Sequence, residues 1–476
     1  MMDRSGNSDG EETSMRKSHP LSRGDSETRF GLLAASSLMA VTVPDRGLGT
    51  SLAALRVSTS AAVPPRARVW PIFGSRSMTI SVPSSRKSGM RPMVAVVPSS
   101  SAQTRDDENL FSAMAFFLLP SYIVRKASWH NRTGIHNMGW NIAVVGVNEM
   151  AGREVLKILA ERDFPVGKVV ALAEGHEMGR SVSFGEKDLK IQSADDFDFS
   201  GIQMAFFAGD SRLALRYAGA AVAAGAVVID GTGHFAQDSK VPLVVPEINP
   251  ESMKDLARFH IVASPSPAAI FLAMVLAPLA GEVGLEQVVA TCMVPVSVAG
   301  TPGMDELFAQ TRTVFMNSRM QGEVFPRQVA FNLLPQVGGF GSDGLSDAEH
   351  RLVVEGRRLL GDKVQIGAHF IQAPVFIGES LALTVGFGEA LTPGSARKYL
   401  SRAPGIKVVD RLAEGGYATP VECAGEDDVF VSRIRKDMSL ENGLAMFVVS
   451  DNSRKGGALN MVQIAEVISG NMVMKD

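Results

Sequence analysis

The pattern of apolar and polar positions changes abruptly at Met138. Residues 1–137 are rich in Ser, Arg and Pro and show no sustained strand or helix period. From Met138 onward, apolar runs of strand length alternate with segments of helical periodicity. A segment with the first texture cannot easily bury enough apolar surface to offset the entropy lost on ordering. We expect residues 1–137 to be either a disordered extension or the result of a misassigned start, with Met138 as the true one.

One apolar run, LFSAMAFFLLPSYIV, lies inside this extension at residues 110–124. It is shorter than the roughly 20 residues that a membrane helix needs, and Pro120 interrupts it. The Arg and Ser residues near the N-terminus are compatible with a transit peptide, but such peptides avoid the Asp and Glu that occur there too. We therefore expect no membrane segment.

The folded part begins with a strand, a turn, a helix and a second strand. NIAVVGV is apolar almost throughout, which predicts a fully buried strand ending at the Gly146 turn. Apolar residues between Val155 and Leu159 predict a helix, and KVVALA predicts the next strand. MAFFAG and AVVIDG add two more short strands. The α/β alternation predicts a doubly wound parallel sheet of the Rossmann type, the fold that binds dinucleotides.

The turn after the first strand is a poor phosphate loop. Gly146 and Gly152 are present, but Glu149 stands at the middle glycine position beside Asn148. Glycines let backbone N–H groups approach a pyrophosphate, whereas a carboxylate adds negative charge near two phosphates. The alternative is that Glu149 simply stands in the first helical turn, where the helix dipole favours it. We expect weak NAD(P) binding or none.

Charge and cysteine content narrow the class of protein. The chain has 47 Lys and Arg against 50 Asp and Glu, for a net charge of -3, and is long enough for two or three domains. This balance gives no reason to expect nucleic acid as a partner. Cys292 and Cys423 have no metal spacing and are too few for a disulfide framework. We expect a cytoplasmic protein without a bound metal.

Four motifs resemble the aspartate-semialdehyde dehydrogenase family and occur in the family's order. They are VPLVVPEINPE (Val241–Glu251), VFPRQVAFNLLPQV (Val324–Val337), VFVSRIRKD (Val429–Asp437) and VSDNSRKGGALNMVQIAE (Val449–Glu466). The resemblance implies a Rossmann NADP-binding domain and an α/β catalytic and dimerisation domain, with the last helix returning to the first domain. We therefore assign residues 138–267 and 452–476 to the first domain and residues 268–451 to the second.

The resemblance also implies a cysteine thiolate that attacks an acyl phosphate or aldehyde, in a motif like ANPNCST at a helix N-terminus. A histidine, a glutamine and arginines assist it. This chain reads ASPSPAA instead, so Pro267 occupies the cysteine position and Ser266 the position before it. Proline is favoured at the first helical position and serine at the cap. The turn is thus expected to keep its backbone shape without a reactive thiol.

Other positions implied by the resemblance are replaced as well. Glu379 in GESL stands at the histidine position, Gln372 in FIQAPVF at the substrate-arginine position, and Met293 in TCMV at the glutamine position. Gly231 and Ala236 in DGTGHFA replace an asparagine and an arginine. A basic residue is kept at Arg351, in AEHRLVVEGRR, where the resemblance implies substrate binding.

The cofactor positions depart from the family too. The segment that grips phosphate reads EGHEMG, with Glu174, His176 and Glu177, and Asn452 follows in the C-terminal motif. Two carboxylates repel a 2′-phosphate, whereas a single acid can bind the ribose 2′-hydroxyl of NAD. We expect no useful NADP binding and weak or absent NAD binding.

Other residues could supply the chemistry instead. Cys292 is a thiol beside Met293, but strand neighbours face opposite ways and we expect it to be buried. Ser266 with Glu379 could form a nucleophile and a base, although a serine cap is the simpler interpretation. We expect structural or surface roles for the histidines His176, His234 and His369.

Together these replacements indicate a family homologue that lacks the family's catalysis, like the Usg-type paralogues, and acts as a scaffold or dimer partner. The apolar segments HFIQAPVFIG and LALTVGFG imply a sheet-based interface, in a homodimer or in a heterodimer with an active paralogue. Two alternatives stay open. One is an active NAD(P)-dependent semialdehyde dehydrogenase of lysine, threonine and methionine biosynthesis, and the other is a hydrolase that uses Ser266.

Overall fold

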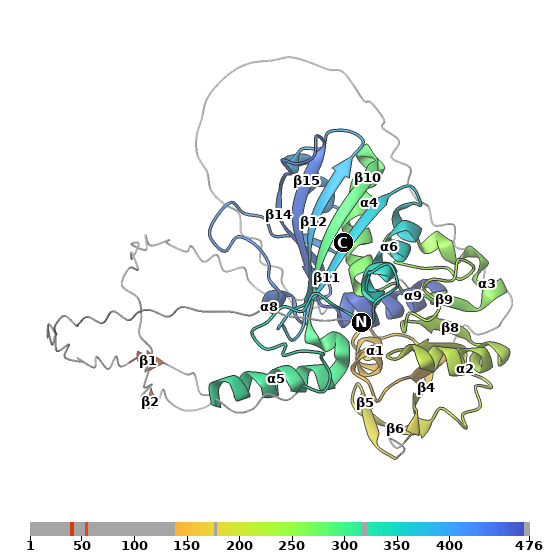
Figure 1. The fold of residues 1–476 in the computed structure, drawn as a ribbon. Coiled ribbons are helices and arrows are strands. Elements are labelled where there is room, and N and C mark those ends of the chain that lie inside the picture. Colours follow the sequence, from red (N-terminus) through yellow and green to blue (C-terminus); the bar gives the residue numbers. More distant parts are fainter. Residues whose placement is uncertain (1–38, 42–52, 56–138, 176–178, 317–321, 471–476) are drawn as a thin grey trace, which may run out of the picture. The chain divides into compact units, whose positions relative to one another are not determined.

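The computed structural model describes residues Met39–Val41, Ala53–Leu55, 139–175, 179–316 and 322–470 (Figure 1). The first two segments are β1 and β2, which pair antiparallel and belong to a separate unit of the chain. These two short strands are the only part of residues 1–137 within the described ranges. The rest of the expected extension lies outside the described part of the chain. No helix within the described ranges has the length and apolar character needed to span a membrane.

The N-terminal sheet of the second unit has seven strands in the order β5-β6-β4-β3-β7-β8-β9. Their bounds are β3 Trp140–Val145, β4 Val166–Ala173, β5 Ser181–Phe184, β6 Lys187–Ser193, β7 Met204–Phe207, β8 Val227–Asp230 and β9 Ile261–Ala263. All neighbours are parallel except β5 and β6. The strand order reverses on either side of β3, which is where this fold places a ligand. The predicted doubly wound sheet is confirmed.

Helices cover both faces of this sheet. Helices α1 (Met150–Glu161) and α9 (Leu459–Ser469) pack together on one face, and α2 (Ser211–Ala223) packs on the other. The apolar positions that predicted α1, from Val155 to Leu159, point into the core as expected. A short connection, η3 (Pro250–Asp255) and α3 (Leu256–Phe259), precedes β9. Because α9 packs against α1 and β8, the C-terminus of the chain completes the first domain.

The second sheet has six strands in the order β11-β10-β12-β15-β14-β13. Their bounds are β10 Leu285–Val294, β11 Gln365–Gln372, β12 Glu379–Phe387, β13 Ile406–Val408, β14 Val429–Lys436 and β15 Gly443–Ser450. Helices α4 (Pro267–Val283), α6 (Asp347–Leu360) and α7 (Pro393–Leu400) pack against one face. Helix α4 is apolar on nearly all sides, as a helix enclosed by other elements should be. The two-domain α/β class is therefore confirmed.

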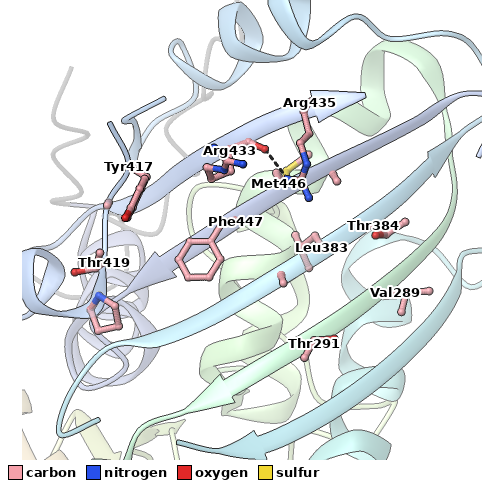
Figure 2. A pocket seen from close by; sticks show the side chains of 14 residues that line it. Val289, Thr291, Leu383, Thr384, Tyr417, Thr419, Arg433, Arg435, Met446 and Phe447 are labelled. Carbon is pink, nitrogen blue, oxygen red and sulfur yellow. Dashed lines mark hydrogen bonds between the residues drawn. The ribbon is translucent and has the colours of Figure 1, made fainter. Parts of the chain in front are cut away.

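The other face of the six-stranded sheet carries a broad groove (Figure 2). Its floor includes Val289, Thr384 and Phe447, and Arg433 and Arg435 of β14 lie along one side. Pro420 of the short helix α8 (Pro420–Cys423) also lines it. The remaining elements are the short helix η4 (Val296–Ala299), the longer α5 (Gly300–Met316), and the π-helical turn η5 (Arg454–Ala458), which leads into α9 and packs against α1 and α4.

Candidate functional site

The site begins at the turn between β9 and α4. Ser266 stands at the N-cap with extended backbone and Pro267 is the first helical residue, as the motif predicts. The Ser266 hydroxyl, however, does not cap its own helix. Both its hydroxyl and its backbone N–H donate to one oxygen of Glu355, at 2.5 and 2.7 Å. The interpretation as a side-chain cap is therefore wrong, because a buried carboxylate from α6 competes for the hydroxyl.

Glu355 connects Ser266 to Arg351. Its side chain is fully buried, and its second oxygen accepts a hydrogen bond from Arg351 Nε at 2.5 Å. The Arg351 guanidinium in turn lies against Gly233, whose φ is +85°, and a β-carbon at that glycine would overlap it. The carboxylate that reaches Ser266 is therefore Glu355 rather than Glu379, the partner weighed from the sequence. The guanidinium of Arg351 is engaged in an ion pair within the chain.

Gln372 and Glu379 lie on the helix-covered face of the second sheet. On one side of β10, Val294 pairs with Gln372 of β11. On the other side, Met293 pairs with Ser380 of β12, so that Glu379 lies beside Val294. Both side chains are buried. The Gln372 amide donates to the Val294 carbonyl at 2.8 Å. The two residues are thus two strands apart on one face.

Glu379 is a buried acid. It is 2% exposed, and burial raises its pKa to about 8 against the opposing charge of Arg351. A carboxyl with that pKa carries a proton at neutral pH. No hydrogen bond to this carboxyl comes from any residue that the structure describes. Glu379 is therefore a neutral acid directed at the same region as the Arg351–Glu355 pair.

Met293 and Cys292 face opposite ways on β10. Met293 lies on the groove side of the sheet with Thr291, so strand alternation separates it from Gln372 and Glu379. Cys292 is fully buried in the core, as expected, and its burial raises the pKa of its thiol well above the usual value. Neither side chain lies at the start of α4.

The loop before α1 has the backbone of a phosphate loop. Gly146 has φ +96°, and a β-carbon there would stand 1.9 Å from the Ala208 carbonyl oxygen. A β-carbon on Gly152 would collide with the Gly146 carbonyl. Both glycines are therefore required by close packing, as the motif predicts. Arg153 donates to the carbonyls of Val147 and Asn148, at 3.1 Å each.

Two polar side chains stand at the mouth of this loop. Glu149 is the N-cap of α1 rather than part of its first turn, and its carboxylate accepts the N–H of Asp210 at 3.3 Å. Burial raises the pKa of Glu149. The Asn148 side-chain oxygen is buried without a hydrogen-bond partner. The loop could offer N–H groups of α1 to an anion, but the Glu149 carboxylate bridges the starts of α1 and α2.

Glu174, at the end of β4, is tied to α2. It accepts hydrogen bonds from Arg216 Nη1 at 3.1 Å and from the Tyr217 hydroxyl at 3.0 Å. Asp195 shares both partners. The Glu174 carboxylate, which was expected to repel a 2′-phosphate, is thus partly neutralised by Arg216. The sequence analysis did not identify this cation. His176 and Glu177 lie outside the described residues.

The Asn452 side chain forms hydrogen bonds within the chain. Its oxygen accepts the N–H of Gly378 at 3.1 Å, and its nitrogen donates to the Ser297 hydroxyl at 3.0 Å. It therefore joins two loops of the second domain, and both ends of its amide are occupied. His369 and His234 are exposed, and no cluster of metal-binding side chains exists in the ranges described.

One buried ion pair escaped the sequence interpretation. Lys455, in η5, is 1% exposed and donates to both oxygens of Glu247 at 2.7 and 2.9 Å. It also donates to Asn460 and Gln463. The only signal in the sequence was the presence of charged residues within the largely uncharged motifs VVPEINPE and RKGGALNM. Removing one member of such a pair would leave the other charge buried without a counter-charge, which strongly destabilises the folded state.

The chain resembles known proteins along most of its folded part. Residues 141–256 match the model of the semialdehyde dehydrogenase NAD binding domain, and residues 276–455 match that of the semialdehyde dehydrogenase dimerisation domain. An aspartate-semialdehyde dehydrogenase of Rickettsia bellii is 39% identical over 69% of this chain and 97% of its own length. One from Aquifex aeolicus is 36% identical over 70% and 98%. The crystal structure of aspartate semialdehyde dehydrogenase II from Vibrio cholerae, complexed with ASA, has a TM-score of 0.68 and 32% identity, over 71% of this chain and 100% of its own.

Proposed function

Because this chain belongs to the aspartate-semialdehyde dehydrogenase family, we propose that it is a non-catalytic homologue that acts as a dimer partner. The observation that carries the proposal is the start of α4. Where the family resemblance implies a thiol, the chain has Pro267, and the neighbouring Ser266 hydroxyl donates to Glu355. The partner is a second copy or an active paralogue, in the cytoplasm.

The bonding of Ser266 argues against its use as a nucleophile. A serine needs a base that accepts its proton while the oxygen faces a substrate. Here a single oxygen of Glu355 accepts both the hydroxyl and the N–H of Ser266, and the other oxygen is paired with Arg351. A carboxylate in an ion pair is a weak base for an alcohol. This arrangement supports a structural role for Ser266.

Neither cysteine is suited to replace the missing thiol. Burial raises the pKa of Cys423 to about 12 and that of Cys292 well above its usual range. The thiolate is the nucleophilic form, so both side chains are unreactive at neutral pH. Both are also fully buried in hydrophobic clusters of the second domain.

One observation favours the alternative of an active NAD(P)-dependent dehydrogenase. Glu379, at the position where the resemblance implies a histidine, has a pKa of about 8 and could act as a general acid near neutral pH. An acid without a nucleophile cannot form the acyl intermediate, however. The proposal of a non-catalytic homologue therefore accounts for more of the residues at the site than the alternative does.

Intact-protein mass spectrometry tests the proposal. The full chain is incubated with aspartate semialdehyde and NADP or NAD in phosphate-free buffer. A working nucleophile would add to the aldehyde, pass hydride to the cofactor and, without phosphate, retain the acyl group. We expect no mass increase, in the unmodified chain or in Ser266→Ala. An added acyl group that is absent from Ser266→Ala or Cys292→Ser would contradict the proposal and identify the nucleophile.

A further inference from the structure

A small pocket lies where two parallel strands of the second sheet end. Strands β10 and β11 end side by side, at Val294 and Gln372. Residues 322–338 return from α5 past this edge, and Leu334 of that segment pairs with Gln372. The pocket has a volume of about 320 Å³, within the range of roughly 300–1,000 Å³ that is usual for small-molecule sites. We call it the strand-end pocket.

The wall of the strand-end pocket is apolar. It includes Val298 of η4 and, from the returning segment, Val324, Phe325, Pro326 and Val337. Val298 and Val324 are 50% and 39% exposed, so both leave apolar surface in contact with water. None of the described residues that line this pocket is charged. A ligand with an apolar body would be bound favourably, because it would remove this surface from water.

Two glutamines supply the polar side chains of the pocket. Gln372 is 5% exposed, and its amide nitrogen donates to the Val294 carbonyl at 2.8 Å. The amide nitrogen of Gln336 donates to the Gly338 carbonyl at 3.1 Å. A backbone carbonyl only accepts hydrogen bonds. Each of these contacts therefore fixes which end of the amide is nitrogen, and leaves the side-chain oxygen at the other end.

The two amide oxygens are left as acceptors. No donor among the described residues reaches the side-chain oxygen of Gln372 or that of Gln336. An amide oxygen that is removed from water without gaining a donor is destabilising. The Gln372 side chain is almost fully buried and lines the pocket, so a donor for its oxygen has to come from the pocket. A bound molecule with an N–H or O–H group would supply it.

The segment that forms the wall is fixed within the chain. The Glu306 carboxylate of α5 accepts two of its N–H groups, including that of Val324 at 2.6 Å. The buried Gln310 of α5 accepts two more, at 2.8 and 3.1 Å. These bonds precede Phe331, whose φ of +57° lies in the left-handed region that a bulky residue rarely adopts. A wall held in this way loses little conformational entropy when a ligand binds.

The pocket disfavours charged ligands of either sign. A carboxylate has no donor for the Gln372 oxygen, and it would lose its hydration against a wall without a cation. An ammonium group has donors, but its charge would find no carboxylate among the lining residues. The arginine that the family resemblance implies at this position would donate to a carboxylate, whereas Gln372 presents an acceptor. The hydrogen-bonding character of the position is thus reversed.

We propose that the strand-end pocket binds an uncharged small molecule of the primary carboxamide class. Such a ligand carries two N–H donors without a charge, while the pocket offers two unpaired amide oxygens, those of Gln372 and Gln336. Its apolar body lies against Val298 and Val324. This inference goes beyond the role as a dimer partner, and it assigns to the chain a class of ligand that the family resemblance does not imply.

The test compares two probes of nearly equal shape, isovaleramide and isovalerate. Both have the same branched apolar body, but the first ends in an uncharged N–H donor and the second in a carboxylate. Each is titrated onto the full-length chain and followed by saturation-transfer NMR, without cofactor or phosphate. We expect isovaleramide to bind with a dissociation constant of about a millimolar, and isovalerate to bind at least about tenfold more weakly.

Three variants locate the binding. Gln372→Leu removes the acceptor and should weaken isovaleramide binding about tenfold. Gln365→Leu is the matched control, because it makes the same change at an exposed position at the other end of β11, and it should leave binding unchanged. Gln372→Leu also takes the donor from the Val294 carbonyl. Val324→Asp, at a partly exposed position of the wall, therefore provides a second variant, which should weaken binding too.

Any of three results would overturn the inference. One is the absence of isovaleramide binding at concentrations about tenfold above a millimolar. Another is equal affinity for the two probes. The third is isovaleramide binding that neither Gln372→Leu nor Val324→Asp weakens, or that Gln365→Leu weakens as much as they do. None of these measurements involves turnover or subunit association, so the pocket assignment can fail while the non-catalytic proposal stands, and the reverse.

Discussion

The ring of Pro267 packs directly against Gly456. A β-carbon built on Gly456 would stand 2.7 Å from Pro267 Cβ and 3.0 Å from the Phe271 ring. Pro267 opens α4, and Gly456 lies in η5, which leads into α9 of the first domain. The start of α4 is thus held against η5 by direct packing, and this contact requires a glycine opposite Pro267.

Gly456→Ala should therefore destabilise the protein. Inserting a methyl group into a packed contact costs typically about 1–3 kcal/mol. Gly219→Ala is the matched control, because a β-carbon there meets open space on α2 and alanine favours a helix. Urea unfolding would measure both. Equal stability of Gly456→Ala and the unmodified chain would show that the contact is loose.

Pro267→Cys should not produce a dehydrogenase. The new thiol would stand at the start of α4, but no histidine would transfer its proton, and Gln372 would not bind a substrate carboxylate as an arginine does. Loss of a catalytic nucleophile can cost about a millionfold in turnover, and restoring it alone does not restore its partners. Steady-state assays with NADP and with NAD would check this, and easily measured turnover would show that the remaining site is competent.

The buried acid Glu379 makes stability depend on pH. Its pKa of about 8 lies above the value of 4.5 for a free carboxyl, so between these pH values the folded state binds a proton that the unfolded state releases. The stabilisation is complete below about 4.5 and is lost as pH rises toward 8. The slope is at most roughly 1.4 kcal/mol per pH unit. Glu379→Gln should flatten this dependence and should be more stable than the unmodified chain at pH 8.

The control for this measurement is Glu414→Gln, at an exposed position. It should leave the pH dependence of unfolding unchanged. If Glu379→Gln and the unmodified chain show parallel curves from pH 5 to 8, Glu379 is ionised in the folded protein and its side chain is hydrated.

Lys455→Met should be among the most damaging single changes. It would leave Glu247 charged, buried and unpaired, and breaking such a pair costs about 3–5 kcal/mol. The double change Lys455→Met with Glu247→Leu should recover much of that loss, since both charges are then removed. Thermal unfolding would compare the stability of the single and the double variant with that of the unmodified chain. A double variant as unstable as the single one would show that packing, not charge, dominates there.

Cofactor affinity should be low and should not favour NADP. Glu149 bridges the starts of α1 and α2 where a pyrophosphate would need N–H groups, and Glu174 would meet the adenine ribose. We expect no measurable NADP binding by calorimetry and NAD binding that is weak or absent. Glu149→Gly should improve NAD binding if the carboxylate is the obstacle. Micromolar NADP affinity of the unmodified chain would contradict this account of the loop.

Much of the fold is predictable because it depends on local pattern. The apolar run before Gly146 and the helical spacing from Val155 to Leu159 place β3, the loop and α1 where the structure has them. Strand alternation also predicts that Cys292 is buried. These features need only the period of the hydrophobic residues and the special backbone of glycine.

The partners of the polar residues are harder to predict. Ser266 and Glu355 are 89 positions apart, and nothing in a helix as charged as AEHRLVVEGRR indicates which acid turns inward. Met293 faces the groove while Gln372 and Glu379 face the helices, a separation that depends on the register of the strands in the sheet. The left-handed backbone of Phe331 depends on Gln310 from another element. Such features follow from tertiary contacts rather than from local pattern.

Turnover by the unmodified protein tests the central claim most directly. The purified full-length chain is assayed with aspartate semialdehyde, phosphate and each of NADP and NAD, at enzyme concentrations high enough to detect a rate about a millionfold below that of a typical enzyme. The account predicts no phosphate-dependent cofactor reduction. A phosphate-dependent rate that disappears in Ser266→Ala or Glu379→Gln would contradict it and would show an active dehydrogenase that works without the family's thiol.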